Sequence, residues 1–128
     1  MAANLKAYNI LVIEDDEMLS EVMLVTFELA GATVRVAHSG ETGLQLFHEM
    51  KPDLVVLDVR LPGITGWDVL KFIRIASNTP VVMLTTMRED QDQIKGLTNG
   101  ADAYLTKPFS AEVLVAQLEA VLRRARRD

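Results

Sequence analysis

The sequence predicts an α/β fold, a doubly wound five-stranded parallel sheet in the order 2-1-3-4-5 with five helices around it. First, short apolar runs alternate with segments of helical periodicity along the whole chain. Second, residues 9–13, 54–57 and 81–84 look buried on both faces, whereas residues 33–37 and 102–106 are mixed, so the former should be central strands and the latter edges. Third, 128 residues suit one domain and are too few for a barrel of eight such units.

The first half of the chain alternates strand and helix. The strand at residues 9–13 ends in a run of three acidic residues. The next helix ends at Gly31, which is typical of a C-cap, and its predicted apolar stripe is Leu19, Val22, Met23, Thr26 and Ala30. Residues 33–37 alternate polar and apolar side chains, which predicts a strand with one wet face, and Ser39 caps a helix over residues 41–50.

The middle of the chain continues this pattern. An apolar run at residues 54–57 ends abruptly in Asp58, and a Pro-Gly pair closes the strand a few residues later. Thr65 caps the helix that follows, where we expect Trp67 to be partly exposed. Residues 81–84 then form the third strand that looks buried.

The last third of the chain contains the weakest predicted element. Residues 89–99 have helical periodicity, but they carry few apolar anchors and a glycine interrupts them. A short strand at residues 102–106 leads to a long last helix that begins near Ser110. The whole of residues 1–128 therefore reads as one domain, without internal repeats or a linker.

Composition excludes several classes of protein. The chain has no cysteine, which excludes disulfides, thiolate metal sites and cysteine nucleophiles. No segment approaches the ~18 consecutive apolar residues of a membrane span, and the amino terminus does not look like a signal peptide, so we expect a cytoplasmic protein without membrane contact. The net charge is −5, and the basic run at residues 123–127 is interpreted as a complement to a helix dipole. An acidic body argues against DNA binding by this segment alone.

Polar side chains follow four of the predicted strands. Glu14 and Asp15 leave the first strand, Asp58 the third, Thr85 the fourth and Lys107 the fifth. Ligands bind beyond the carboxyl ends of the strands in a doubly wound sheet. By itself Asp58 would be an ordinary turn or capping aspartate, but the convergence of three carboxylates, a hydroxyl and an ammonium predicts a site.

This predicted crevice holds the groups that phosphoryl transfer requires. Crowded carboxylates repel unless a cation joins them, and oxygen ligands suit Mg²⁺, or a similar hard ion such as Mn²⁺. Open metal positions beside a lysine and a hydroxyl favour phosphoryl transfer. The nucleophile must then be a carboxylate, because cysteine is absent and His38 and His48 lack partners at ligand spacing.

Four blocks of the sequence together resemble the receiver domain of bacterial two-component response regulators, a flavodoxin-like fold. The resemblance covers nearly the whole chain, and each block occupies an expected strand end. It implies a phosphorylation-dependent signalling switch rather than an enzyme, with self-phosphorylation and autodephosphorylation as its only reactions. The blocks are Ile10 to Asp16, Asp58 to Asp68, Pro80 to Thr85 and Gly100 to Phe109.

The resemblance also implies a role for each acidic residue. Asp58 is expected to accept a phosphoryl group from the phosphohistidine of a sensor histidine kinase. Asp15 and Asp58 are expected to bind Mg²⁺ together with the backbone carbonyl of Arg60, and Glu14 to reach the ion through water. Asp16, third in the acidic run, is expected to lie outside the site.

The remaining site residues are expected to act on the phosphoryl group or to relay its presence. Lys107 should pair with Asp58 and then with the phosphoryl oxygens, next to a cis bond to Pro108. Thr85 should hydrogen-bond a phosphoryl oxygen, and Tyr104 should swing inward as Thr85 moves. Without the resemblance, Thr85 and Tyr104 would be an ordinary strand-ending threonine and an edge-strand aromatic residue.

Two other functions remain open from the residues. A phosphohydrolase of the haloacid dehalogenase type also uses carboxylates and Mg²⁺. That family has the motif Asp-x-Asp after a strand, whereas here the residue two positions after Asp58 is Arg60. A flavin- or nucleotide-binding module would have the same topology, but no glycine-rich loop follows the first strand.

The carboxyl-terminal helix resembles that of receivers fused to winged-helix DNA-binding domains. DNA would then be a partner only through an output domain that is absent from this chain, and a stand-alone receiver is the alternative. That subfamily dimerises through helix 4, strand 5 and helix 5 by ion pairs, but the matching positions here are uncharged, among them Gln93 and Gln117. An apolar homodimer contact through Val113 and Val115 is the remaining possibility.

Overall fold

The predicted sheet order is confirmed in a computed structural model, which describes residues 4–86 and 100–127. Five parallel strands are hydrogen-bonded in the order β2-β1-β3-β4-β5. The elements are β1 (Asn9–Ile13), α1 (Glu17–Leu29), β2 (Thr33–Ala37), α2 (Gly40–Met50), β3 (Leu54–Asp58), α3 (Gly66–Ala76), β4 (Val81–Thr86), β5 (Ala103–Lys107) and α5 (Ala111–Arg127).

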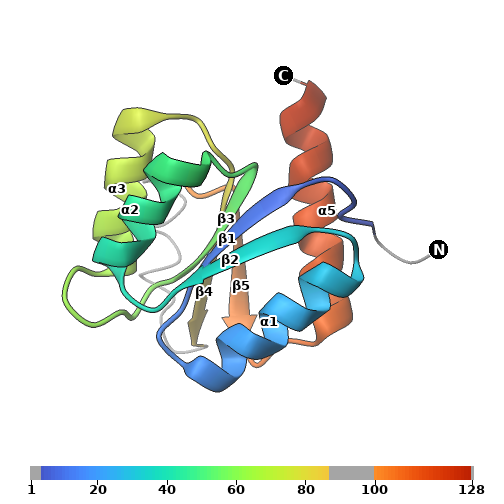
Figure 1. Ribbon diagram of the computed structural model, residues 1–128, viewed down its shortest axis with the longest axis horizontal. Helices are drawn as coiled ribbons and strands as arrows, with labels where there is room; N and C mark the ends of the chain where they lie inside the picture. The colour runs from blue at the N-terminus through green and yellow to red at the C-terminus, as the bar shows by residue number, and fades with distance from the viewer. Residues whose placement is uncertain (1–3, 87–99, 128) are drawn as a thin grey trace.

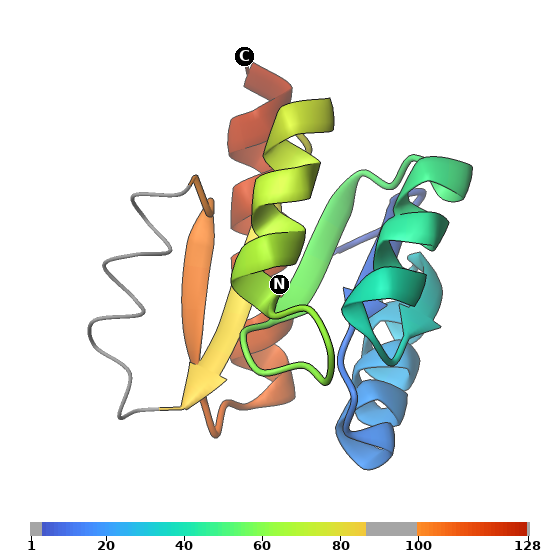
Figure 2. The same ribbon diagram turned by 90° about the vertical axis from the view of Figure 1, so that its left-hand side faces the viewer.

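The helices form layers on both faces of the sheet (Figures 1 and 2). Helices α1 and α5 cover one face, and α2 and α3 cover the other. The part of the chain that the structure describes thus contains four helices, and the predicted helix at residues 89–99 lies outside it. None of the described helices is long and apolar enough to cross a membrane.

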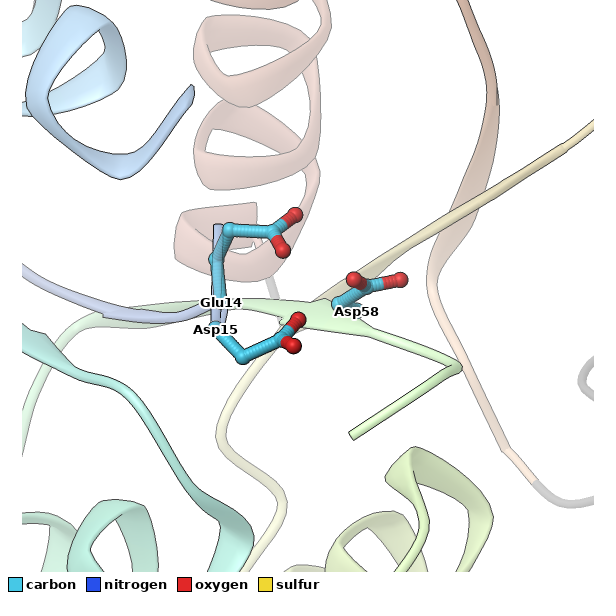
Figure 3. A group of neighbouring side chains, drawn as sticks. All are labelled: Glu14, Asp15 and Asp58. Atoms are coloured by element: carbon cyan, nitrogen blue, oxygen red, sulfur yellow. The ribbon is translucent and has the colours of Figure 1, made fainter. Parts of the chain in front are cut away.

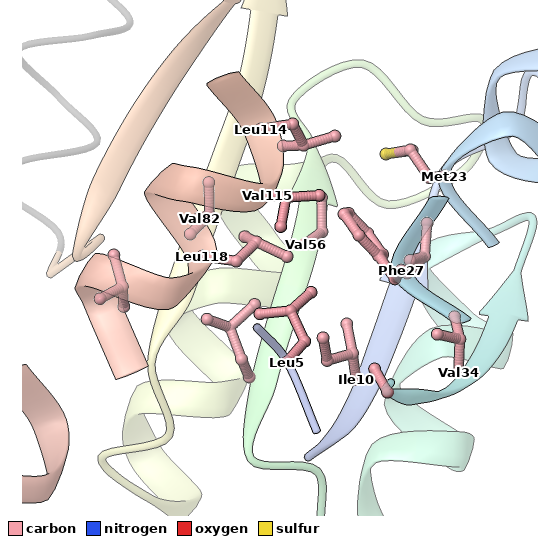
Figure 4. Close-up of a cluster of buried hydrophobic side chains, with 14 of the residues drawn as sticks. Leu5, Ile10, Met23, Phe27, Val34, Val56, Val82, Leu114, Val115 and Leu118 are labelled. Atoms are coloured by element: carbon pink, nitrogen blue, oxygen red, sulfur yellow. The ribbon is translucent and has the colours of Figure 1, made fainter. Parts of the chain in front are cut away.

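Two hydrophobic cores follow from the alternation of side chains along each strand. Ile10 and Val12 of β1 pack with α1 and α5, in what we call the α1/α5 core (Figure 4). Leu11 and Ile13 of the same strand pack with α2 and α3, in the α2/α3 core. Because all five residues of β3 are buried, this strand is fixed from both sides. The edge strands β2 and β5 retain exposed or half-buried positions, as predicted.

Three local predictions were wrong, each because more than one helix face is apolar. Val22 was placed on the buried stripe of α1 but is 51% exposed, and Met23 and Phe27 are buried instead. Val115 was offered as a surface contact but belongs to the α1/α5 core, which leaves Val113 as the exposed residue of that pair. Trp67 is buried rather than partly exposed.

The connection from β3 to α3 is tightly packed at Gly66. The Gly66 N–H donates to the carbonyl oxygen of Val59 at 2.9 Å. Thr65 caps α3 with a reciprocal capping box, in which its side chain and that of Asp68 each accept from the other's backbone N–H. A Cβ atom at Gly66 would collide with the backbone carbonyl oxygen of Asp58. Gly66 therefore allows the start of α3 to lie directly against the end of β3.

We predict that Gly66→Ala lowers the free energy of unfolding by about 1–3 kcal/mol, because backbone atoms of Asp58 and Val59 would have to move. Urea unfolding followed by circular dichroism measures this change. The matched control is Lys71→Ala on the exposed face of the same helix, which should stay within about 0.5 kcal/mol of the wild type. A Gly66→Ala protein as stable as this control would refute the packing argument.

Candidate functional site

The sheet register brings the predicted site residues to one edge. Ile13 pairs with Leu57, and Leu57 pairs with Met83, so β3 ends one residue past the level of Ile13 and β4 continues three residues past it. Asp58 ends β3, and Glu14 follows β1 directly. Their side chains therefore meet at the carboxyl edge of the sheet.

Three carboxylates cluster at this edge, as Figure 3 shows. Glu14, Asp15 and Asp58 each offer an oxygen, and these oxygens lie within 4.8 Å of one another. Glu14 is 1% exposed and Asp58 is 4% exposed, whereas Asp15 is exposed. The cluster thus has two buried carboxylates and one that faces outward.

Lys107 supplies the positive charge inside the cluster. Its Nζ donates to Glu14 Oε1 at 2.9 Å and to Asp58 Oδ2 at 3.2 Å. The resemblance to receiver domains implies a pair between Lys107 and Asp58, and the structure adds Glu14 as the closer partner. The Lys107-Pro108 peptide bond is cis, as expected.

Backbone donors satisfy the remaining carboxylate oxygens in part. The Asp16 N–H donates to Glu14 Oε2 at 3.1 Å, and the Arg60 N–H donates to Asp58 Oδ1 at 3.3 Å. The Asp16 side chain accepts from the Leu19 N–H and is the N-cap of α1. Acidic residues two positions apart therefore have different roles, since Asp16 caps α1 while Glu14 points into the cluster.

The pKa values reflect this crowding. Burial raises the pKa of Glu14, contact with Asp58 raises it further, and Lys107 and the Asp16 N–H offset the rise only in part. Burial lowers the pKa of Lys107, but Glu14 and Asp58 outweigh it, so that this pKa is raised overall. An acid whose pKa is raised by folding costs stability as pH increases through its titration, whereas the charged lysine contributes stability until pH exceeds its raised pKa.

Thr85 and Tyr104 lie on the neighbouring strands. Thr85 of β4 is 4% exposed and pairs with Thr106 of β5. Tyr104 of β5 is half-buried, packs against the α2/α3 core and has a buried hydroxyl oxygen. Its ring stacks on that of Trp67, with centroids 6.4 Å apart and planes inclined by 21°. We call this arrangement of Tyr104 the inward position.

The donor set fits a hard divalent cation. Carboxylate oxygens suit Mg²⁺ and Mn²⁺, and an exposed Asp15 beside buried Asp58 leaves room for water ligands. Such an ion would also reduce the repulsion that raises the Glu14 pKa. Among the described residues, Glu14, Asp15 and Asp58 are the group with this spacing.

Two side-chain contacts of the site were not predicted from the sequence. The pair between Lys107 and Glu14 depends on side-chain conformations, because β3 and β4 lie between β1 and β5 in the sheet, although the position of both residues at strand ends signals that they lie at the same edge. The stack of Trp67 on Tyr104 joins residues 37 positions apart (104 − 67), and no spacing rule in the sequence marks it.

Comparisons with known proteins agree with this geometry. The family model of the response regulator receiver domain matches residues 10–119. The transcriptional regulatory protein AfsQ1 of Streptomyces coelicolor is 43% identical over 120 residues, which cover 94% of this chain and 53% of that protein. The DNA-binding dual master transcriptional regulator RpaA of a Synechocystis species is 41% identical, covering 92% of this chain and 50% of that protein. This chain spans about half the length of these relatives.

Solved structures have the same fold. A two-component response regulator from Clostridium difficile superimposes with a TM-score of 0.88 at 32% identity, covering 92% of this chain and 98% of the other. The chemotaxis protein CheY4 of Vibrio cholerae superimposes with a TM-score of 0.84 at 30% identity, covering 89% and 98%.

We predict that Asp58→Asn raises the free energy of unfolding by about 0.5–2 kcal/mol in metal-free buffer at pH 7. The amide removes one of two buried like charges, while Lys107 keeps its closer partner Glu14. The control is Asp15→Asn, which removes an exposed carboxylate of the same cluster and should change stability by less than about 0.5 kcal/mol. Chemical denaturation provides both values, and a clear loss of stability in Asp58→Asn would contradict the crowded-acid account.

Proposed function

The chain belongs to the response regulator receiver domain family, and we propose that Asp58 is the residue on which it is phosphorylated. Members of this family are phosphorylation-dependent signalling switches rather than conventional enzymes. The observation that carries the assignment is the position of Asp58. It is the carboxylate that contacts both the Lys107 ammonium and the Arg60 N–H at the carboxyl edge of the sheet.

The proposed reaction transfers a phosphoryl group to a carboxylate oxygen of Asp58. That oxygen attacks phosphorus, the bond from phosphorus to the donor breaks, and an acyl phosphate forms. With a phosphohistidine donor the ring nitrogen leaves and regains a proton, and with acetyl phosphate the leaving group is acetate. Positioning and charge neutralisation account for most of the catalysis of such transfers.

The family uses a divalent metal at its acidic pocket, and we assign Mg²⁺ (or Mn²⁺) to Asp15, Asp58 and the backbone carbonyl of Arg60, with Glu14 acting through water. The ion would supply neutralisation of the phosphoryl oxygens. Exposed Asp15 supports this assignment, because it can bind an ion without losing a buried partner.

Lys107 is assigned to the phosphoryl oxygens. Its ammonium already lies 3.2 Å from Asp58 Oδ2, and its raised pKa keeps it protonated at neutral pH. A phosphoryl group on Asp58 would place new anionic oxygens beside this ammonium. The Lys107 contact with Glu14 would then compete with a more highly charged partner.

The relay of the phosphorylation signal is assigned to Thr85 and Tyr104. Thr85 lies near the end of β4, and Tyr104 lies in the neighbouring strand β5. The Thr85 hydroxyl would bond a phosphoryl oxygen, and Tyr104 would report the shift to the face formed by helix 4, β5 and α5. Helix 4, predicted at residues 89–99, lies outside the described residues. The half-exposed state of β5 supports this route, because weakly buried elements change position at low cost.

Receiver domains interact with sensor histidine kinases, and we propose such a kinase as the physiological donor. An apolar groove of about 360 Å³ beside the site could accommodate the kinase, since Lys107 lies at its edge and its main lining residues are Met18, Leu19, Val22, Pro108 and Phe109.

Residues 1–128 are proposed to be one receiver domain, and any effect on DNA would act through a further domain, as the names of its relatives suggest. A homodimer through helix 4, β5 and α5 would use exposed Val113.

The decisive test is incubation with acetyl phosphate and Mg²⁺, followed by mass measurement of the intact protein. We predict one phosphoryl adduct on the wild type and none on Asp58→Asn. Replacing Mg²⁺ by a chelator should abolish the adduct as well, because the acidic cluster would repel the donor without the ion.

The matched control is Asp16→Asn, which changes an acidic residue two positions from Glu14 and preserves an N-cap oxygen for the Leu19 N–H. This variant should be labelled like the wild type. An adduct that persists in Asp58→Asn, or steady phosphate release that survives that substitution, would instead favour a phosphohydrolase.

A further inference from the structure

The stacked pair of Trp67 and Tyr104 has no part in the proposed transfer chemistry. It connects α3, which starts directly against the end of β3, to β5. Trp67 lies in the first turn of α3 and is 7% exposed. Tyr104 lies in β5, with its hydroxyl oxygen buried. Their offset-parallel geometry, with centroids 6.4 Å apart, is within the range of favourable aromatic pairs.

Trp67 is the firmly held member of this pair. It follows Gly66, which lies against the Asp58 carbonyl and donates to the Val59 carbonyl oxygen. The capping box of Thr65 and Asp68 fixes the same helical turn. The indole therefore has a fixed position relative to the end of β3, the strand that carries Asp58.

Tyr104 is the member that can change position. Among the strands that the structure describes, β5 lies at the edge of the sheet next to β4, and Leu105 is its buried residue while the other four are half-buried. Displacing a side chain from such a strand breaks fewer contacts than displacing one from β3, which is buried throughout.

We infer that Trp67 is a positioning residue of the switch, an inference that rests on the proposed function. By stacking on Tyr104, the indole favours the inward position before any phosphoryl group is present. An aromatic pair of this kind changes an equilibrium roughly two- to tenfold. Trp67 therefore sets how much of the unphosphorylated protein already has Tyr104 inward, and thus how large a change phosphorylation can produce.

The inference can be tested without phosphorylation. The chain has two tyrosines, so fluorotyrosine labelling gives one ¹⁹F signal for Tyr104 and one for Tyr8. Tyr8 packs against the α1/α5 core and serves as an internal control. A soluble gadolinium chelate broadens the signal of a ring in proportion to its exposure. In Trp67→Leu we expect broadening of the Tyr104 signal to increase roughly two- to tenfold, with no change at Tyr8.

Trp67→Phe keeps an aromatic face and should retain most of the protection of Tyr104. A purely space-filling role predicts instead that Trp67→Phe resembles Trp67→Leu, because phenylalanine is closer in volume to leucine than to tryptophan. If Trp67→Leu does not fold, Trp67→Ile replaces it with the same expected result, because isoleucine is apolar and has no π face to stack on Tyr104. Unchanged protection of Tyr104 in the folded non-aromatic variant would overturn the inference, as would equal broadening at Tyr8. Acetyl phosphate labelling of the same proteins tests the function separately, so a protein that is never labelled but shows the Trp67 effect would refute only the function.

Discussion

The structure of the site depends on one ammonium held between two buried carboxylates. Lys107 lies 2.9 Å from Glu14 and 3.2 Å from Asp58, and both acids are almost fully removed from solvent. Buried carboxylates destabilise a fold unless a cation or hydrogen-bond donors compensate them. Since the cation comes from β5 and the acids from the ends of β1 and β3, the charge balance ties an edge strand to the centre of the sheet.

The two ends of the edge strand β5 are held by different contacts. At its start, Arg74 of α3 donates to the Gly100 carbonyl oxygen and pairs with Asp102 at 2.8 Å, and Asp102 also accepts from the Val81 N–H. At its end, Lys107 depends on the charges around Asp58. A change of charge at Asp58 therefore acts directly on the carboxyl end of β5, through Lys107.

Most of the architecture could be predicted, because apolar runs and strand-end residues are local signals. The buried runs at β1, β3 and β4 predict the central strands, and Asp58 at the end of one of them predicts the acidic edge. What could not be predicted depends on side-chain packing between distant elements. The burial of Trp67, its contact with Tyr104 and the exposure of Val22 belong to this class, because apolar residues on several helix faces do not indicate which face meets the sheet.

The central claim is that Glu14 and Asp58 share one buried, incompletely neutralised site. Carbon-13 NMR titration of the Glu14 carboxyl group in metal-free protein tests it most directly. We expect a pKa above the ordinary value of 4.5, because burial and the neighbouring Asp58 both raise it, and we expect that pKa to fall in Asp58→Asn. A Glu14 pKa at or below 4.5, or one that Asp58→Asn leaves unchanged, would contradict the account.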